Sequence, residues 1–382
     1  MTAVTLSAAD RRRSLAAIIG GGFGTGMGMG SVLPLLTLLM QRDGLDSVVI
    51  GLNAAMFPLA VLCCGPFIPV IARRLGTLRA IYASLVIFSA VIPLYWLTPF
   101  WVWFPLRFVA GGAGALYWIV SETWINLVAT DENRGRVTAI YAMVLTAGFT
   151  LGPIIIGAVG IDGFAPFAVA FLANILVLVP MPFVRRLAPD LSNQAPMRFR
   201  RGFAAAPAIL VAVIAGGCSD MAVIALLPIY ALEGGLDQQG ATLLLAIFTF
   251  GNAILQWPIG WLADKTDRFR VLVWTVALVF LGAVLLPFVA DTRWLLWILL
   301  FVWGGVGFGI YTVALAVLGE RIPAAELAAA NTLFVMVYET GSLSGPVLAG
   351  GAMDLMGRQG MPLVVALAAG AFLVFIAIRR RN

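Results

Sequence analysis

The sequence predicts an all-α membrane protein with twelve transmembrane helices, arranged as two pseudo-symmetric six-helix bundles. Three observations lead to this prediction. Hydrophobic residues make up 62% of the 382-residue chain and charged residues only 11%, which excludes an ordinary soluble domain. The apolar residues fall into long runs, and short motifs of the first half recur in the second. Little of the chain lies outside these runs, so we expect no sizeable soluble domain.

Each predicted helix is a run of about 20 or more mainly apolar residues, which is enough to cross the hydrocarbon core of a bilayer. The first run follows Arg11, Arg12 and Arg13, as a signal peptide would, but it is too long for one and has no cleavage pattern. We therefore expect it to be the first span. The runs lie near residues 15–40, 48–72, 79–99, 101–128, 136–160, 164–184, 205–231, 240–263, 271–290, 293–318, 328–352 and 361–378.

Basic residues collect in alternate loops, and this sets the predicted orientation. With the N-terminus inside, the outer loops hold only Arg42, Arg293 and Arg358, and the inner loops hold almost all the others. Because cytoplasmic loops are enriched in Lys and Arg, we expect a multi-pass protein of the inner (cytoplasmic) membrane with both termini in the cytoplasm. The net charge of +6 then reports topology and does not indicate a nucleic-acid partner.

One long polar stretch, residues 185–204, separates the first six runs from the last six. It carries Pro, Asn, Gln and several arginines, a composition typical of a loop. We interpret it as a cytoplasmic linker between an N-terminal bundle at residues 1–184 and a C-terminal bundle at residues 205–382.

The two predicted bundles are related by an internal repeat. The matching segments superimpose Pro34 on Pro228 and the Gly152-Pro153 pair on the Gly345-Pro346 pair. Such parallel repeats are typical of transporter folds whose halves are related by an axis along the membrane normal. The segments are 27–36 with 221–230, and 146–157 with 339–350.

A charged turn between the runs 240–263 and 271–290 carries a family resemblance. Burying the charges of this turn in the hydrocarbon of a bilayer would be energetically costly, so the turn must lie at a membrane face. Its pattern, Gly260-x-x-x-Asp264-Lys265-x-x-Arg268, resembles the signature loop of the major facilitator superfamily, with Asp267 where a second glycine is usual. The resemblance implies the major facilitator fold.

Further motifs resemble the same family. Arg107-x-x-x-Gly111 is similar to its helix-4 arginine motif, and Gly148-x-x-x-Gly152-Pro153 is similar to the motif of its drug–proton antiporters. The copy of the second motif at residues 341–346 is compatible with a packing role alone. The first-half loop departs from the signature, because Arg73 stands where an aspartate is usual. Glu122-x-Trp124 and Arg134-Gly135-Arg136 resemble the YcaD-like branch of bacterial facilitators.

The glycine-rich run at residues 20–30 resembles a nucleotide-binding loop in its glycine content. It lies inside an apolar span and follows no strand, so we interpret it as a surface where helices approach closely. The expected partner is the run 136–160, through Gly148 and Gly152.

Ionisable residues within the spans are rare, and by default they mark function. Asp220 and Glu339 each lie roughly 20 Å from the inner end of their helices, which is close to the membrane midplane. The family arrangement makes these helices neighbours. Two carboxyls in a low dielectric resist double ionisation and titrate together, so we interpret the pair as the proton-coupling site. Arg107 is expected either to face the cavity as a counter-ion or to reach toward the outer face.

The remaining candidates form a predicted gate and a predicted cavity. Glu122 and Glu320 occupy matching inner ends of their spans, where we expect them to pair with arginines of the signature loops. The predicted gate consists of Arg73, Glu122, Gly260, Asp264, Lys265, Arg268 and Glu320. The predicted substrate cavity is lined by Arg107, Tyr117, Trp118, Thr146, Thr150, Asn252, Gln256, Tyr311 and Tyr338, although helix packing explains each aromatic equally well.

These features favour a secondary transporter over an enzyme or a channel. The sequence has no Walker motif, no constellation of nucleophile, base and metal, and no histidine, so we expect no cofactor and no metal. The repeat with its proline-bearing helices favours alternating access. We expect a monomer that exports a small amphipathic or cationic compound by proton antiport. Proton-coupled uptake of a small metabolite and lipid translocation are the alternatives. The expected partners are the substrate, protons and membrane lipids.

Overall fold

The computed structural model describes residues 7–129, 134–179, 181–188, 207–321 and 327–379, and these residues are almost entirely helical. Short 3-10 turns join several of the helices. The α-helices are α1 (Ala8–Arg42), α2 (Ser47–Cys64), α3 (Ile68–Leu75), α4 (Thr77–Leu97), α5 (Trp103–Val128), α6 (Arg134–Val159), α7 (Ala165–Leu178), α8 (Pro207–Glu233), α9 (Gln238–Lys265), α10 (Arg268–Val289), α11 (Arg293–Arg321), α12 (Leu327–Met356) and α13 (Gly360–Arg379).

The second predicted span is broken near its end. A 3-10 turn, Gly65–Phe67, separates α2 from α3. Pro66 stands at the start of the 3-10 turn and Pro69 at the start of α3, and proline has no N–H to continue a helix. With α2 and α3 counted as one broken span, the thirteen described helices make twelve. By length and composition, nine stretches of the described residues are able to cross a bilayer, with α12 and α13 joined in one of them.

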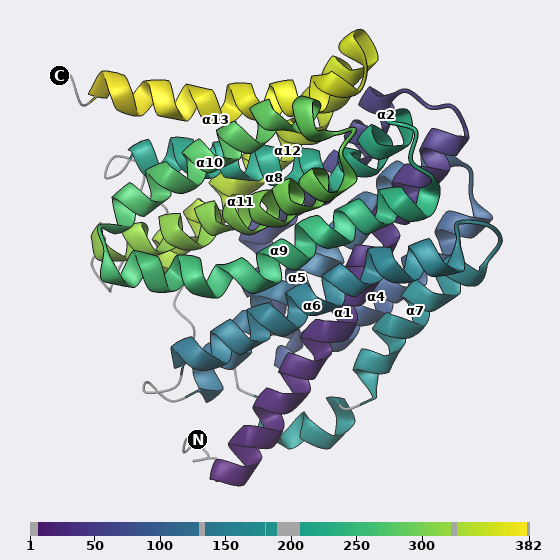
Figure 1. Cartoon of the computed structure of the whole chain (residues 1–382). Helices are drawn as coiled ribbons and strands as arrows, with labels where there is room; N and C mark the ends of the chain where they lie inside the picture. The colour runs from purple at the N-terminus through teal and green to yellow at the C-terminus, as the bar shows by residue number, and fades with distance from the viewer. Residues whose placement is uncertain (1–6, 130–133, 180, 189–206, 322–326, 380–382) are drawn as a thin grey trace.

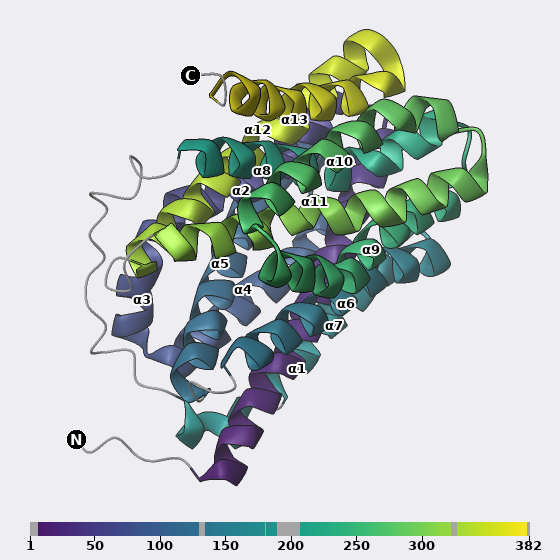
Figure 2. The same cartoon turned by 60° about the vertical axis from the view of Figure 1, so that its left-hand side comes forward.

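The helices form two groups that follow the halves of the sequence. Helices α1, α4, α6 and α7 lie in the lower part of Figure 1, α8 and α10–α13 lie in the upper part, and α2 reaches the upper right, where it packs against α12. Helix α1 begins and α13 ends on the same side of the molecule, the left-hand side of Figure 2. We call this side the termini face and the opposite side the far face. Most of the predicted linker, residues 189–204, lies outside the described residues.

Glycines bring pairs of helices into backbone contact in both halves. Gly26 and Gly30 of α1 lie directly against the carbonyls of Leu145 and Phe149 of α6, and Gly148 lies against that of Phe23. The predicted role of the glycine-rich run is therefore confirmed. Helices α8 and α12 pack in the same way, with Gly341 against Ile214 and Gly345 against Cys218. The repeated glycine–proline motif thus serves close packing in each half.

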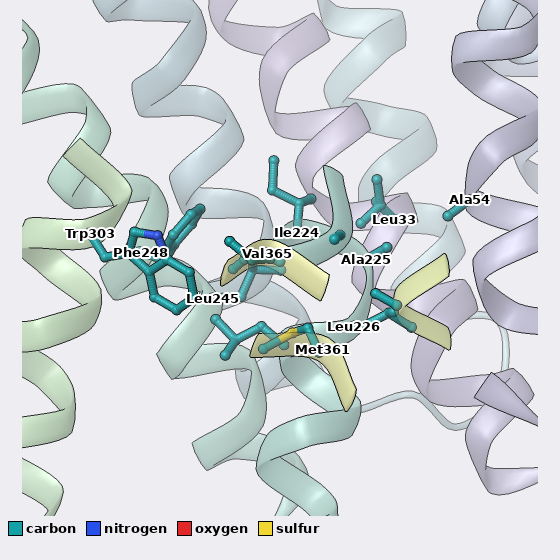
Figure 3. Packing of buried hydrophobic residues seen from close by; sticks show 14 of the residues in the cluster. Leu33, Ala54, Ile224, Ala225, Leu226, Leu245, Phe248, Trp303, Met361 and Val365 are labelled. Atoms are coloured by element: carbon teal, nitrogen blue, oxygen red, sulfur yellow. The ribbon is translucent and has the colours of Figure 1, made fainter. Parts of the chain in front are cut away.

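An apolar core joins the two halves near the far face. It includes residues of α1, α2 and α8 that pack in one cluster, among them Leu33, Ala54, Ala225 and Leu226 (Figure 3). A second cluster, which includes Leu15 and Ile18 at the start of α1, consists only of residues of the N-terminal half. The contact between the halves is thus richest where α1 and α2 approach the far face.

Glycines also mark places where the two halves are in contact. Near the far face, Gly51 of α2 lies against Pro346 of α12, and Gly157 of α6 lies against Thr242 of α9. These contacts pack the two halves together at the far face.

Candidate functional site

Asp220 lies in the middle of α8, and its carboxylate accepts a hydrogen bond from the Tyr338 hydroxyl of α12 at 2.9 Å. Only 2% of the residue is exposed. On its other side, Asp220 Oδ1 is 2.9 Å from the place a Cβ would occupy at Gly307 of α11. The glycine makes room for the carboxylate, so Asp220 is enclosed by three helices.

Glu339 follows Tyr338 in α12 and is also buried, with 6% exposed. Successive residues of an α-helix point about 100° apart, so Tyr338 and Glu339 leave α12 in different directions. Glu339 interacts electrostatically with the hydroxyls of both Tyr311 and Tyr338. The Tyr311 ring packs edge-on against Tyr338, with centroids 5.0 Å apart, and against Phe334 at the same distance. Tyrosines thus connect the surroundings of the two acids.

The sequence predicts that Asp220 and Glu339 act together as a proton-coupling pair, and this stays a prediction. Asp220 and Glu339 lie on adjacent helices, as expected, but Tyr338 is the partner of Asp220. Within the described ranges neither acid forms a salt bridge. Burial of an ionised carboxylate without a counter-charge costs several kcal/mol. Both positions are therefore suited to a carboxyl that takes up and releases a proton.

Glu122 brings a third acid to the boundary between the halves. The indole Nε1 of Trp118, one turn earlier in α5, donates a 2.6 Å hydrogen bond to Glu122 Oε1. The charge of Glu122 acts on Tyr141 within its own half and on Tyr311 of the opposite half. Glu122 is thus close enough to both halves to interact with them electrostatically, and its predicted gate role stays a prediction.

A chain of polar side chains links α9 and α11. Gln256 Nε2 donates to Asn252 Oδ1 at 2.7 Å, and the Thr312 hydroxyl donates to Gln256 Oε1 at 2.8 Å. Thr312 is exposed. Because polar side chains at this depth avoid lipid, we expect Thr312 to face away from the lipid. Thr312 is not among the residues predicted from the sequence, although a lone hydroxyl beside Tyr311 in an apolar helix is a usable signal.

The structure places several predicted cavity residues inside the N-terminal half. Arg107 is buried beside Tyr95 of α4, whose hydroxyl it affects electrostatically. Tyr117 is 2% exposed and packs against Gly21 of α1. Thr150 of α6 is also buried. We therefore leave these three residues out of the proposed site. Thr146, one turn before Thr150, is half-buried and remains a candidate.

The charged turn between α9 and α10 forms local contacts. Arg268 binds Asp264 at 2.8 Å, and the Lys265 ammonium lies 4.4 Å from the centre of the Trp261 ring. A Cβ added at Gly260 would meet no atom within 4 Å. Arg73 is half-buried in α3. Glu320 belongs to α11, but its side chain lies outside the described residues, so a bridge from Glu320 to this turn stays a prediction.

Metal chemistry has no visible support in this site. The described part of the chain contains no group of three or more His, Cys, Asp or Glu side chains that could hold a metal ion. The arrangement instead offers carboxyls, hydroxyls, amides and aromatic rings, which are groups that exchange protons and bind organic molecules.

Comparison with known proteins agrees with this description. The family model of the Major Facilitator Superfamily matches residues 18–314 and, in a second match, residues 209–382. The chain therefore belongs to the major facilitator superfamily: it is a multi-pass membrane protein, it carries out secondary transport of small molecules, and it is not an enzyme.

Relatives of similar length support the resemblance to YcaD-like members. The uncharacterized MFS-type transporter YfkF of Bacillus subtilis (strain 168) is 28% identical over 341 residues, which is 86% of each chain. The uncharacterized MFS-type transporter YcaD of Escherichia fergusonii is 28% identical over 356 residues, covering 91% of this chain and 90% of that protein.

Solved structures confirm the fold. A structure of the nucleoside transporter NupG superimposes with a TM-score of 0.80 at 14% identity, covering 95% of this chain and 99% of that one. A bacterial homolog of the human lysosomal transporter Spinster, in an inward-facing and unoccupied conformation, gives a TM-score of 0.73 at 15% identity, covering 97% and 96%. At these identities the likeness concerns the fold alone.

Proposed function

We propose that this transporter exports a small amphipathic or cationic compound in exchange for protons, with Asp220 and Glu339 as the proton-coupling residues. The observation that carries the proposal is the burial of two carboxyls on adjacent helices without a salt bridge in the described residues. Such groups are costly in a membrane unless they bind a proton or a cation. A carrier that alternates between protons and a cation uses both options.

The surroundings of the acids suit an organic cation. The Tyr338 hydroxyl contacts Asp220 and the Tyr311 ring packs against Tyr338, so aromatic rings lie near the acids, and cations are attracted to the faces of such rings. Glu122 adds negative charge from the opposite half. The chain of Asn252, Gln256 and Thr312 offers hydrogen bonds to a polar part of the same ligand.

The contacts between the halves support alternating access. Tight glycine contacts near the far face correspond to the state closed at that face, which is one of the two states such a carrier needs. With the termini face in the cytoplasm, which the basic residues predict, this state is open inward and ready to accept a compound for export.

Transport of ethidium, an amphipathic organic cation, by protein reconstituted in liposomes tests the proposal. With an acidic interior, proton–substrate antiport drives ethidium into the liposomes, whereas symport requires an acidic exterior. We expect Asp220→Asn and Glu339→Gln to abolish gradient-driven accumulation. Counterflow without a pH gradient should survive in both variants, because each variant keeps one of the two carboxyls for the cation and alternating access does not require both.

Asp291→Asn serves as the matched control, because Asp291 is 90% exposed at the far face and lies outside the site. It should retain both activities. Gradient-driven accumulation that persists in Asp220→Asn and Glu339→Gln would remove these residues from the coupling mechanism. Accumulation only with an acidic exterior would instead support uptake.

A further inference from the structure

The N-terminus of α2 has no cap from its own segment. A helix begins with backbone N–H groups that have no acceptor within the helix, and the side chain just before it usually accepts from them. Asp46 occupies that position with an extended backbone, but its side chain makes no capping hydrogen bond. The first turn of α2 therefore needs an acceptor from elsewhere.

Asp354 of α12 supplies this acceptor from the opposite half. Its Oδ1 accepts the Ser47 N–H at 2.7 Å, and its Oδ2 accepts the Val48 N–H at 2.9 Å. A carboxylate at a helix N-terminus also interacts favourably with the positive end of the helix dipole. Both oxygens of one side chain thus hold a helix of the other half.

The surrounding surfaces are built for this contact. Pro346, Gly350 and Asp354 are spaced four residues apart, so they share one face of α12. Gly350 lies directly against the carbonyl of Ser47, and Pro346 lies against Gly51, one turn further along α2. Any larger side chain at either glycine would push the helices apart and withdraw the carboxylate from the N–H groups.

We infer that Asp354 is a positioning residue for transport, which holds the far ends of the two halves together by capping α2. Opening of the far face separates α2 from α12, so both hydrogen bonds must break in that state. The capping bonds then stabilise the state closed at the far face, and their loss shifts the population toward the state open there.

This inference rests on the alternating access in the proposed function, but it does not depend on proton coupling, on the substrate or on the direction of transport. A failure of the coupling residues in the ethidium assay leaves the predicted effect of Asp354 unchanged. The two ideas therefore fail separately.

The test measures distances between spin labels at the far face in purified protein in lipid nanodiscs. Labels on cysteines placed at Trp101 of the N-terminal half and Arg293 of the C-terminal half report the separation of the halves, in a background without the native cysteines. In Asp354→Ala the ratio of far-face-open to far-face-closed molecules should rise on the order of tenfold, as expected for the loss of a helix cap. Asp354→Asn retains one acceptor oxygen and should give a smaller rise.

Two controls distinguish the capping of α2 by Asp354 from a general structural role. Asp354→Glu retains the carboxylate and should keep most of the closed population. Asp162→Asn removes a far-face ion pair with Arg42, 2.9 Å long, that lies within the N-terminal half, and it should leave the distances unchanged. Unchanged distances in folded Asp354→Asn, or an equal shift in Asp162→Asn, would overturn the inference. A lower Tm without a change in distances would assign Asp354 a role in stability only.

Discussion

At the scale of single residues, the membrane interior makes every polar group informative. Asp220 is surrounded by apolar residues of α8, and its hydrogen bond from Tyr338 only partly replaces the water that a carboxylate loses. Gly307 leaves space for the carboxylate, so the site depends on a small residue as well as on polar ones.

The Thr312 hydroxyl provides a prediction at this scale. Thr312→Val keeps the shape of the side chain and removes the donor to Gln256. Loss of one hydrogen bond costs about 0.5–1.5 kcal/mol, so the KM for ethidium should rise roughly threefold to tenfold if the polar chain binds substrate. The requirement for a pH gradient should not change.

Thr266→Val is the matched control, because within the described residues the Thr266 hydroxyl, just after α9 at the termini face, donates to the carbonyl of Leu262 and to no other group. Its KM should remain that of the unmodified protein. An unchanged KM in Thr312→Val would place the α9–α11 polar chain outside the substrate site.

At the scale of helices, glycines determine which pairs pack closely. The α1–α6 and α8–α12 pairs use glycines at repeated positions, so the closest contacts of each half follow the internal repeat. Because small residues permit backbone approach in membranes, the glycine-rich run of α1 is a packing surface along much of its length.

The substitutions Gly26→Ala and Gly20→Ala test this surface. A Cβ at Gly26 would collide with the carbonyl of Leu145, whereas a Cβ at Gly20 would meet no atom within 4 Å. Gly26→Ala should lower the Tm of the purified protein by several degrees. Gly20→Ala should leave the Tm unchanged or raise it, since alanine favours helix by about 1 kcal/mol over glycine. Equal Tm values for the two variants would show that α1 and α6 can move apart to accept a methyl group without loss of stability.

At the scale of the whole molecule, the two halves meet through the far-face cluster, the α2–α12 contact and the α6–α9 contact. Large apolar side chains such as Trp257, Phe288 and Leu355 are exposed on the outside of the helices. Water would penalise such a surface, whereas lipid accommodates it. The same molecule therefore combines a lipid-facing exterior with a polar set of residues between its halves.

The orientation of the molecule is tested by cysteine labelling in intact cells, after replacement of the native cysteines. A membrane-impermeant maleimide should label a cysteine at Asn193, in the predicted linker outside the described residues, only after the cells are permeabilised. A cysteine at Asp291 of the far face should label without permeabilisation. Efficient labelling at Asn193 in intact cells would reverse the proposed topology, and with it the direction in which the described state is open.

The sequence by itself determined the helical spans, the relation between the two halves, the family and the buried acids. These features depend on composition along one segment, on spacing within it, and on the cost of placing a charge in hydrocarbon. The same local reasoning found the glycine surface of α1, because small residues at helical spacing have few other roles in a membrane span.

Only the tertiary structure decided which side chains meet. It assigned Tyr338 to Asp220 and placed Arg107 close enough to Tyr95 for the two to interact electrostatically. It also joined Asp354 to the start of α2, across 307 residues of sequence. The physical reason is that a helix apolar on all sides carries no stripe that shows which face turns inward. Its rotation and register are set by packing against neighbouring helices, and that information lies in several distant segments together.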